Sequence, residues 1–94
     1  MDKHKIEAAL VTVIKQVQET SGRPAPDITE STTPIGDIDG FDSLLAVEAT
    51  VMLEQALGCT LSDGTPFVSQ DGKKALSLGQ IVDRVAEMIT GRAA

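Results

Sequence analysis

Apolar residues recur every three or four positions along the first part of the chain. Between residues 3 and 19 they are Ile6, Leu10, Val13, Ile14 and Val17. This spacing places them on one face of an α-helix and leaves polar residues on the other face. Gly22 and Pro24 follow, and both are typical of a helix end. The pattern predicts an amphipathic helix over 3–19.

Residues 21–42 lack this periodicity and are rich in Pro, Gly, Ser, Thr and Asp. We expect Pro24, Pro26 and Pro34 each to block helix propagation, because proline lacks a backbone N–H and its ring clashes with the preceding turn. The stretch is therefore predicted to be a long ordered loop. Loops of this length inside a small domain are usually functional.

The segment 43–57 contains neither Gly nor Pro and predicts a second helix. Asp42 is its candidate N-cap, and Gly58 is its candidate C-terminal stop. Both residue types are favoured at these positions, so the two ends of this helix are defined by the sequence.

This second helix is too apolar to be buried on one face in a domain of this size. Ten of the fourteen residues in 44–57 are apolar. Leu44, Val47 and Val51 share one side at helical spacing, and we interpret them as a stripe that docks a partner protein. The alternative is that neighbouring loops cover the stripe.

The stretch 59–76 is interrupted by two turn signals, Ser62-Asp63-Gly64-Thr65 and Gln70-Asp71-Gly72-Lys73. Apolar pairs, Phe67-Val68 and Ala75-Leu76, flank the second signal. We expect these pairs to form a short hairpin over 65–76 across Asp71-Gly72.

A third long helix is predicted after this irregular element. Ser77 and Gln80 have the spacing of a capping box, and an apolar stripe follows until Gly91, which we expect to end the helix. The stripe consists of Ile81, Val82, Val85, Met88 and Ile89. Three main helices, a long first loop and a short irregular third element predict an all-α fold, a small bundle around one core.

Composition limits the class of protein. The 94 residues suffice for a single domain over 1–94. Fourteen acids and eight bases give a net charge of −6, which argues against nucleic acid and anionic membranes because both are bound by basic patches. One cysteine excludes an internal disulfide, and the N-terminus lacks the apolar run of a signal peptide. We expect a cytoplasmic monomer.

The charges are segregated along the chain. Every Lys and Arg lies in 1–23 or 73–94, whereas residues 24–72 hold nine of the fourteen acids and no base. Solvation of an ordinary acidic loop explains such a stretch. An electronegative docking surface explains it equally.

The chain lacks the residues for catalysis. Ser43 is a candidate nucleophile, but the single histidine, His4, lies near the terminus, and no Gly-x-Ser-x-Gly elbow surrounds the serine. Cys59 also lacks a nearby base, so we interpret it as a core residue. We therefore predict no catalytic residue.

A calcium site is the metal-binding alternative. Asp37, Asp39 and Glu48 fall at positions one, three and twelve of an EF-hand loop. The fit fails because position five is Phe41, which has no side-chain oxygen, and position six is Asp42 instead of the required glycine. We therefore predict no dedicated metal site.

The motif Asp42-Ser43-Leu44 opens the apolar-rich helix directly after the acidic loop. This segment closely resembles the attachment site of acyl carrier proteins. The similarity continues in Val47-Glu48, Leu53-Glu54 and Gly58, which stand in the register of that family's second helix. The order of elements resembles the family over essentially the whole chain.

The resemblance implies that Ser43 carries a 4′-phosphopantetheine arm, with Asp42 and Leu44 completing the motif. A phosphopantetheinyl transferase would install the arm, which explains a serine without its own base. The arm's thiol would carry acyl groups as thioesters from an acyl-loading ligase or synthase to downstream enzymes. Fatty-acid, polyketide or related specialised biosynthesis is the expected context.

Enzymes that use such carriers generally present basic patches, so we expect the base-free stretch to steer them toward Ser43. The apolar stripe would provide the contacts beside the charges. The predicted docking acids are Asp37, Asp39, Asp42, Glu48 and Glu54.

Some positions depart from the family's usual pattern. Leu45 stands where fatty-acid carriers usually have an acid, Gln55 and Ala56 replace further glutamates, and 59–76 is long and poor in acid. These departures favour a specialised carrier over a housekeeping one. A peptidyl or aminoacyl carrier and an unmodified helical adaptor remain the alternatives.

Overall fold

The structure is a computed structural model of the chain. It describes residues 2–23, 27–38, 40–58, 60–61, 65–69 and 72–93, with the backbone alone for 90–93. Within these ranges the chain forms four helices, which are α1 (Lys3–Thr20), α2 (Pro34–Asp37), α3 (Ser43–Leu57) and α4 (Leu78–Ala93). The fold is all-α, as the sequence predicts.

The first helix forms as predicted, one residue longer than expected. Asp2 caps α1, since its carboxylate accepts a hydrogen bond of 3.0 Å from the backbone N–H of His4. The apolar face predicted for this helix is buried throughout. After Thr20 the chain turns away at Gly22, whose φ of +76° is favourable for glycine.

The long loop contains a helical turn that the sequence reasoning did not predict. Pro34 was expected to block a helix, but it is the first residue of α2. Proline suits that position because its missing N–H would have no partner there and its φ is already helical. Inside the turn Ile35 and Gly36 leave helical geometry, so α2 stays short.

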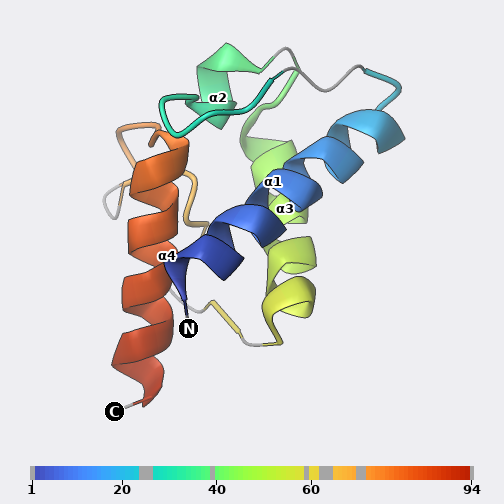
Figure 1. The fold of residues 1–94 in the computed structure, drawn as a ribbon. Coiled ribbons are helices and arrows are strands. Elements are labelled where there is room, and N and C mark those ends of the chain that lie inside the picture. The colour runs from blue at the N-terminus through green and yellow to red at the C-terminus, as the bar shows by residue number, and fades with distance from the viewer. Residues whose placement is uncertain are drawn as a thin grey trace.

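Both α3 and α4 pack against α1, which crosses the bundle in front of them (Figure 1). Small residues on α3, Ala46 and Ala49, are completely buried together with Leu53. Their small side chains allow the backbones of α1 and α3 to approach closely. Figure 1 places the start of α3 at the same end of the bundle as α2 and the end of α1.

The predicted hairpin pairing over 65–76 forms as a single antiparallel bridge between Val68 and Ala75. The backbone N–H of Leu76 donates to the carbonyl of Phe67 over 3.0 Å, so the two apolar pairs do face each other. Asp71, at the predicted turn, lies outside the described residues.

The capping box of α4 is confirmed, with the Ser77 N–H donating to Gln80 Oε1 over 3.0 Å. Its predicted apolar stripe faces the core. Gly91 does not end the helix, which continues to Ala93, because glycine weakens a helix but retains the N–H that its hydrogen bonds require. Over the part of the chain that is described, no helix is both long and apolar enough to cross a membrane.

Candidate functional site

Ser43 is the first residue of α3, and its side chain is exposed. The preceding Asp42 caps the helix, because its Oδ1 accepts hydrogen bonds from the N–H groups of Leu44 at 3.1 Å and Leu45 at 3.0 Å. The cap fixes the backbone on both sides of the serine. The hydroxyl therefore lies at an accessible helix start whose backbone is fixed.

The segment before Ser43 is anchored on both sides of Gly40. Ile38 and Phe41 are each at least 97% buried, and the Phe41 N–H donates to the Ile38 carbonyl over 3.1 Å. The Phe41 ring contacts the ring of Phe67, with centroids 5.4 Å apart and planes tilted by 52°. The irregular 65–69 stretch thereby supports the loop that presents the serine.

The apolar stripe on α3 is exposed, as the docking interpretation predicts. Leu44 is 77% exposed, Val47 56% and Val51 49%. The described loops leave these side chains uncovered because the buried face of α3 is the opposite one. An exposed apolar row next to a polar surface is typical of a protein interaction site.

The predicted docking acids differ in what they do locally. Asp37 Oδ2 accepts from the Thr33 N–H over 2.8 Å, and Glu54 is half-buried and accepts from the Leu61 N–H over 2.6 Å. Asp42 is the cap described above, and Glu48 is fully on the surface. Three of the acids therefore also hold the backbone in place.

Two of the remaining predictions concern residues outside the described part of the chain, Asp39 and Cys59. Among the described residues, no group of three or more His, Cys, Asp or Glu side chains converges as a metal site would require. This finding does not extend to Asp39, one of the three carboxylates of the EF-hand alignment, because it lies outside the described residues.

A basic residue, Arg23, lies beside the segment that precedes Ser43. The guanidinium of Arg23 packs directly on Gly40, in the space that a Cβ would occupy. The sequence indicated a base-free surface around the serine, and this contact corrects that prediction. No local signal could have revealed it, because the two residues are far apart in the sequence and meet only in the fold.

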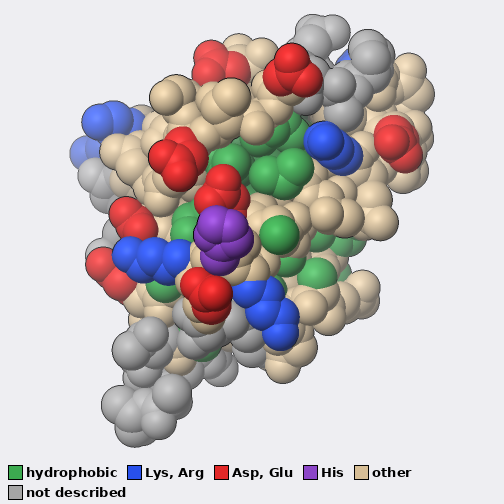
Figure 2. Space-filling view, viewed as in Figure 1, with side chains coloured by type: hydrophobic (Ala, Val, Ile, Leu, Met, Phe, Trp, Pro, Cys, Tyr) green, Lys and Arg blue, Asp and Glu red, His purple; other side chains and the backbone are tan. Residues whose placement is uncertain are grey.

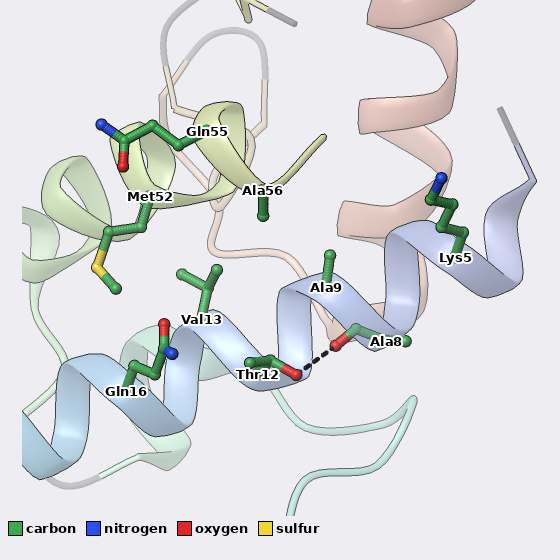
Figure 3. Close-up of a pocket in the computed structure, with 9 residues that line it drawn as sticks. All are labelled: Lys5, Ala8, Ala9, Thr12, Val13, Gln16, Met52, Gln55 and Ala56. Carbon is green, nitrogen blue, oxygen red and sulfur yellow. Dashed lines mark hydrogen bonds between the residues drawn. The ribbon is translucent and has the colours of Figure 1, made fainter. Parts of the chain in front are cut away.

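A groove of about 580 Å³ lies between α1 and α3 (Figure 3). Figure 3 shows Ala9 and Val13 of α1 directed toward Met52 and Ala56 of α3. The described residues that line it are Lys5, Ala8, Ala9, Thr12, Val13, Gln16, Met52, Gln55 and Ala56. Most of these side chains are apolar or carry an amide, and none of these nine is a carboxylate, histidine or cysteine.

The face on which α1 lies in front carries charges of both signs around a central apolar area (Figure 2). This mixture agrees with the position of the bases at the two ends of the chain.

Comparison with known families identifies the kind of domain that these residues form. The family model described as "Phosphopantetheine attachment site" matches residues 11–65, more than half of the chain. The chain belongs to this family. The chain itself matches no curated protein and no solved structure.

Members of the phosphopantetheine-attachment family bind 4′-phosphopantetheine covalently and act as carriers rather than as catalysts. Carrier domains of this kind interact with phosphopantetheinyl transferases and with acyl-processing enzymes. The observed site suits such a group: an exposed hydroxyl stands at the N-terminus of a helix of 15 residues. The positive end of that helix favours the negative charge of a phosphodiester.

Proposed function

We propose that this carrier domain holds acyl groups as thioesters on a 4′-phosphopantetheine arm attached to Ser43. The observation that supports the proposal most directly is the exposure of Ser43 at the start of α3, inside the range matched by the family model. An exposed helix start has room for a bulky modification, whereas a buried serine would have to leave the core to be modified.

Ser43 acts in this proposal as an acceptor and needs no base of its own. During loading its Oγ forms a bond to phosphorus, a bond of the coenzyme A pyrophosphate breaks, and the nucleotide part leaves. The hydroxyl proton passes to a base on the transferase. When bound, the arm supplies the thiol that carries the acyl group.

The surface beside Ser43 supports recognition by enzymes with an apolar patch inside a basic rim. Leu44, Val47 and Val51 offer the apolar contact, and Glu48 lies on the same exposed side of α3. Charges of this kind raise the association rate and orient the encounter more than they add affinity. Added salt screens these interactions and lowers the rate. The partners would be a phosphopantetheinyl transferase, an acyl-loading ligase or synthase, and downstream enzymes of fatty-acid, polyketide or related pathways.

Mass spectrometry tests the attachment. The apo protein is incubated with coenzyme A and a broad-specificity phosphopantetheinyl transferase, and the expected result is a mass gain of one phosphopantetheine. Ser43→Ala should gain nothing. Ser77→Ala is the matched control, since Ser77 also precedes a helix, and it should be modified like the wild type.

A protein-interaction adaptor is the second candidate, because the exposed stripe would serve an unmodified protein as well. The same experiment separates the two functions. A folded wild-type sample that gains no mass contradicts the carrier function and leaves the adaptor. If the arm is attached, loading assays with acyl and with aminoacyl donors distinguish an acyl carrier from a peptidyl or aminoacyl carrier.

A further inference from the structure

The contact between Arg23 and Gly40 brings a single cation to the segment that leads into Ser43. An ideal Cβ at Gly40 would overlap the guanidinium and would lie 2.8 Å from Arg23 Nε. Gly40 has a φ of +77°, so its backbone disfavours a side chain there, and an added Cβ would displace the end of the arginine side chain. The absence of a side chain at Gly40 therefore leaves space for the guanidinium against the loop.

Both sides of this contact are held in place. The Arg23 backbone is fixed by the end of α1, where its N–H donates to the Gln18 carbonyl over 2.9 Å. On the other side, the buried residues Ile38 and Phe41 anchor the loop around Gly40. The backbones on both sides of the contact are thus anchored, and the arginine side chain spans the space between them.

The guanidinium has donors available for a ligand. The side chain of Arg23 is exposed, and among the described residues it has no recorded ion pair or hydrogen bond. Arginine presents five N–H donors in a planar fork that matches two oxygens of a phosphate. Asp37 and Asp42, on either side of Gly40 in the sequence, each direct a carboxylate oxygen to backbone N–H groups.

The glycine that Arg23 contacts and the serine belong to the same short segment. Gly40 precedes Ser43 by three residues, so their Cα atoms are at most about 11 Å apart. An arm on Ser43 begins with a phosphate only one bond beyond Oγ. Both side chains are exposed, so pairing of the phosphate with the guanidinium requires side-chain rotation and no rearrangement of the core.

We propose that Arg23 is the counter-ion of the phosphodiester that joins the arm to Ser43. This inference rests on the proposed function. The guanidinium offsets the repulsion between the phosphodiester and the acids of the loop, and it directs the first bonds of the arm toward the loop side of α3. Arg23 is thus a positioning residue for the arm.

Nuclear magnetic resonance of the labelled protein tests this pairing without an activity assay. The Nε–H signal of Arg23 is compared before and after loading, in a sample whose mass gain is verified first. We expect this signal to move on loading, while the signal of Arg84, which lies on α4, stays in place. Added salt should reverse part of the movement, because an exposed ion pair is screened.

Variants separate charge from geometry. Arg23→Gln should change the ³¹P signal of the loaded protein, and Arg23→Lys should give an intermediate value, because lysine keeps the charge but lacks the fork. Gly40→Ala should displace the guanidinium and reproduce the Arg23→Gln signal. Gly58→Ala is its matched control, with a φ of +71° and open space around the glycine, and should leave the ³¹P signal unchanged.

The possible outcomes are distinct. Absence of any mass gain contradicts the proposed function itself. A verified mass gain with an unmoved Arg23 signal overturns only the pairing. An Arg23 signal that moves on Asp39→Asn in the apo protein, yet not on loading, assigns the guanidinium to that carboxylate and likewise overturns it.

Discussion

The N-cap of α3 offers a sharp test, because one carboxylate both caps the helix and precedes the candidate attachment serine. Asp42→Ala removes two hydrogen bonds, to the N–H groups of Leu44 and Leu45. Loss of an N-cap costs about 0.5–2 kcal/mol, and loss of the negative charge at the helix start costs about 0.3–1 kcal/mol. We therefore expect a decrease of roughly 1–2 kcal/mol in the free energy of unfolding.

Asp42→Asn is the matched control because it keeps a capping oxygen and loses only the charge. It should lower the free energy of unfolding by no more than about 1 kcal/mol. Urea unfolding followed by far-ultraviolet circular dichroism measures both variants. For a small domain the alanine variant should shift the midpoint by roughly 1 M and the melting temperature by about 4–8 °C per kcal/mol. An alanine variant as stable as the wild type would refute the capping role.

The other predictions concern the two faces of α3 and its acids. Leu53→Ala should lower the free energy of unfolding by about 2–5 kcal/mol, because Leu53 is fully buried. Leu44→Ala should change it by less than about 0.5 kcal/mol; equal losses in urea unfolding would mean that the stripe is covered in solution. Glu54→Ala should lower the free energy of unfolding by about 1 kcal/mol and speed hydrogen exchange of the Leu61 amide, which donates a hydrogen bond to Glu54. Glu54→Gln should preserve most of the protection of that amide. Glu48→Gln should slow transferase association at low salt by up to about fivefold, in stopped-flow measurements where Glu87→Gln, an exposed position on α4, has no effect.

Local rules located most of the fold because each predicted helix carries its own start and its own apolar face. The start of α3 at Ser43 follows from a capping aspartate and an uninterrupted helical stretch. The failures occurred where one residue type serves two purposes. Pro34 predicts a helix break, but it begins α2, because proline is also favoured at the first position of a helix. Gly91 predicts a helix end, but α4 continues past it, because glycine does not remove a backbone donor.

Tertiary contacts changed the interpretation of the charges. The sequence treats Glu54 as one more docking acid, but its carboxylate holds the amide of Leu61. Such a pairing cannot be seen in a linear pattern, since it depends on the path of the chain after Gly58. The exposed stripe, in contrast, was predictable because a single helix cannot bury ten apolar residues against one core.

The sequence by itself determined the three long helices, the capped serine and the apolar stripe, because these depend on residues a few positions apart. Only the tertiary structure decided what surrounds the serine. Arg23 reaches Gly40 because the end of α1 and the loop before α3 lie at the same end of the bundle. A charge acts over distance in space and not along the chain, so a segment without a single base in its sequence still has a cation beside it.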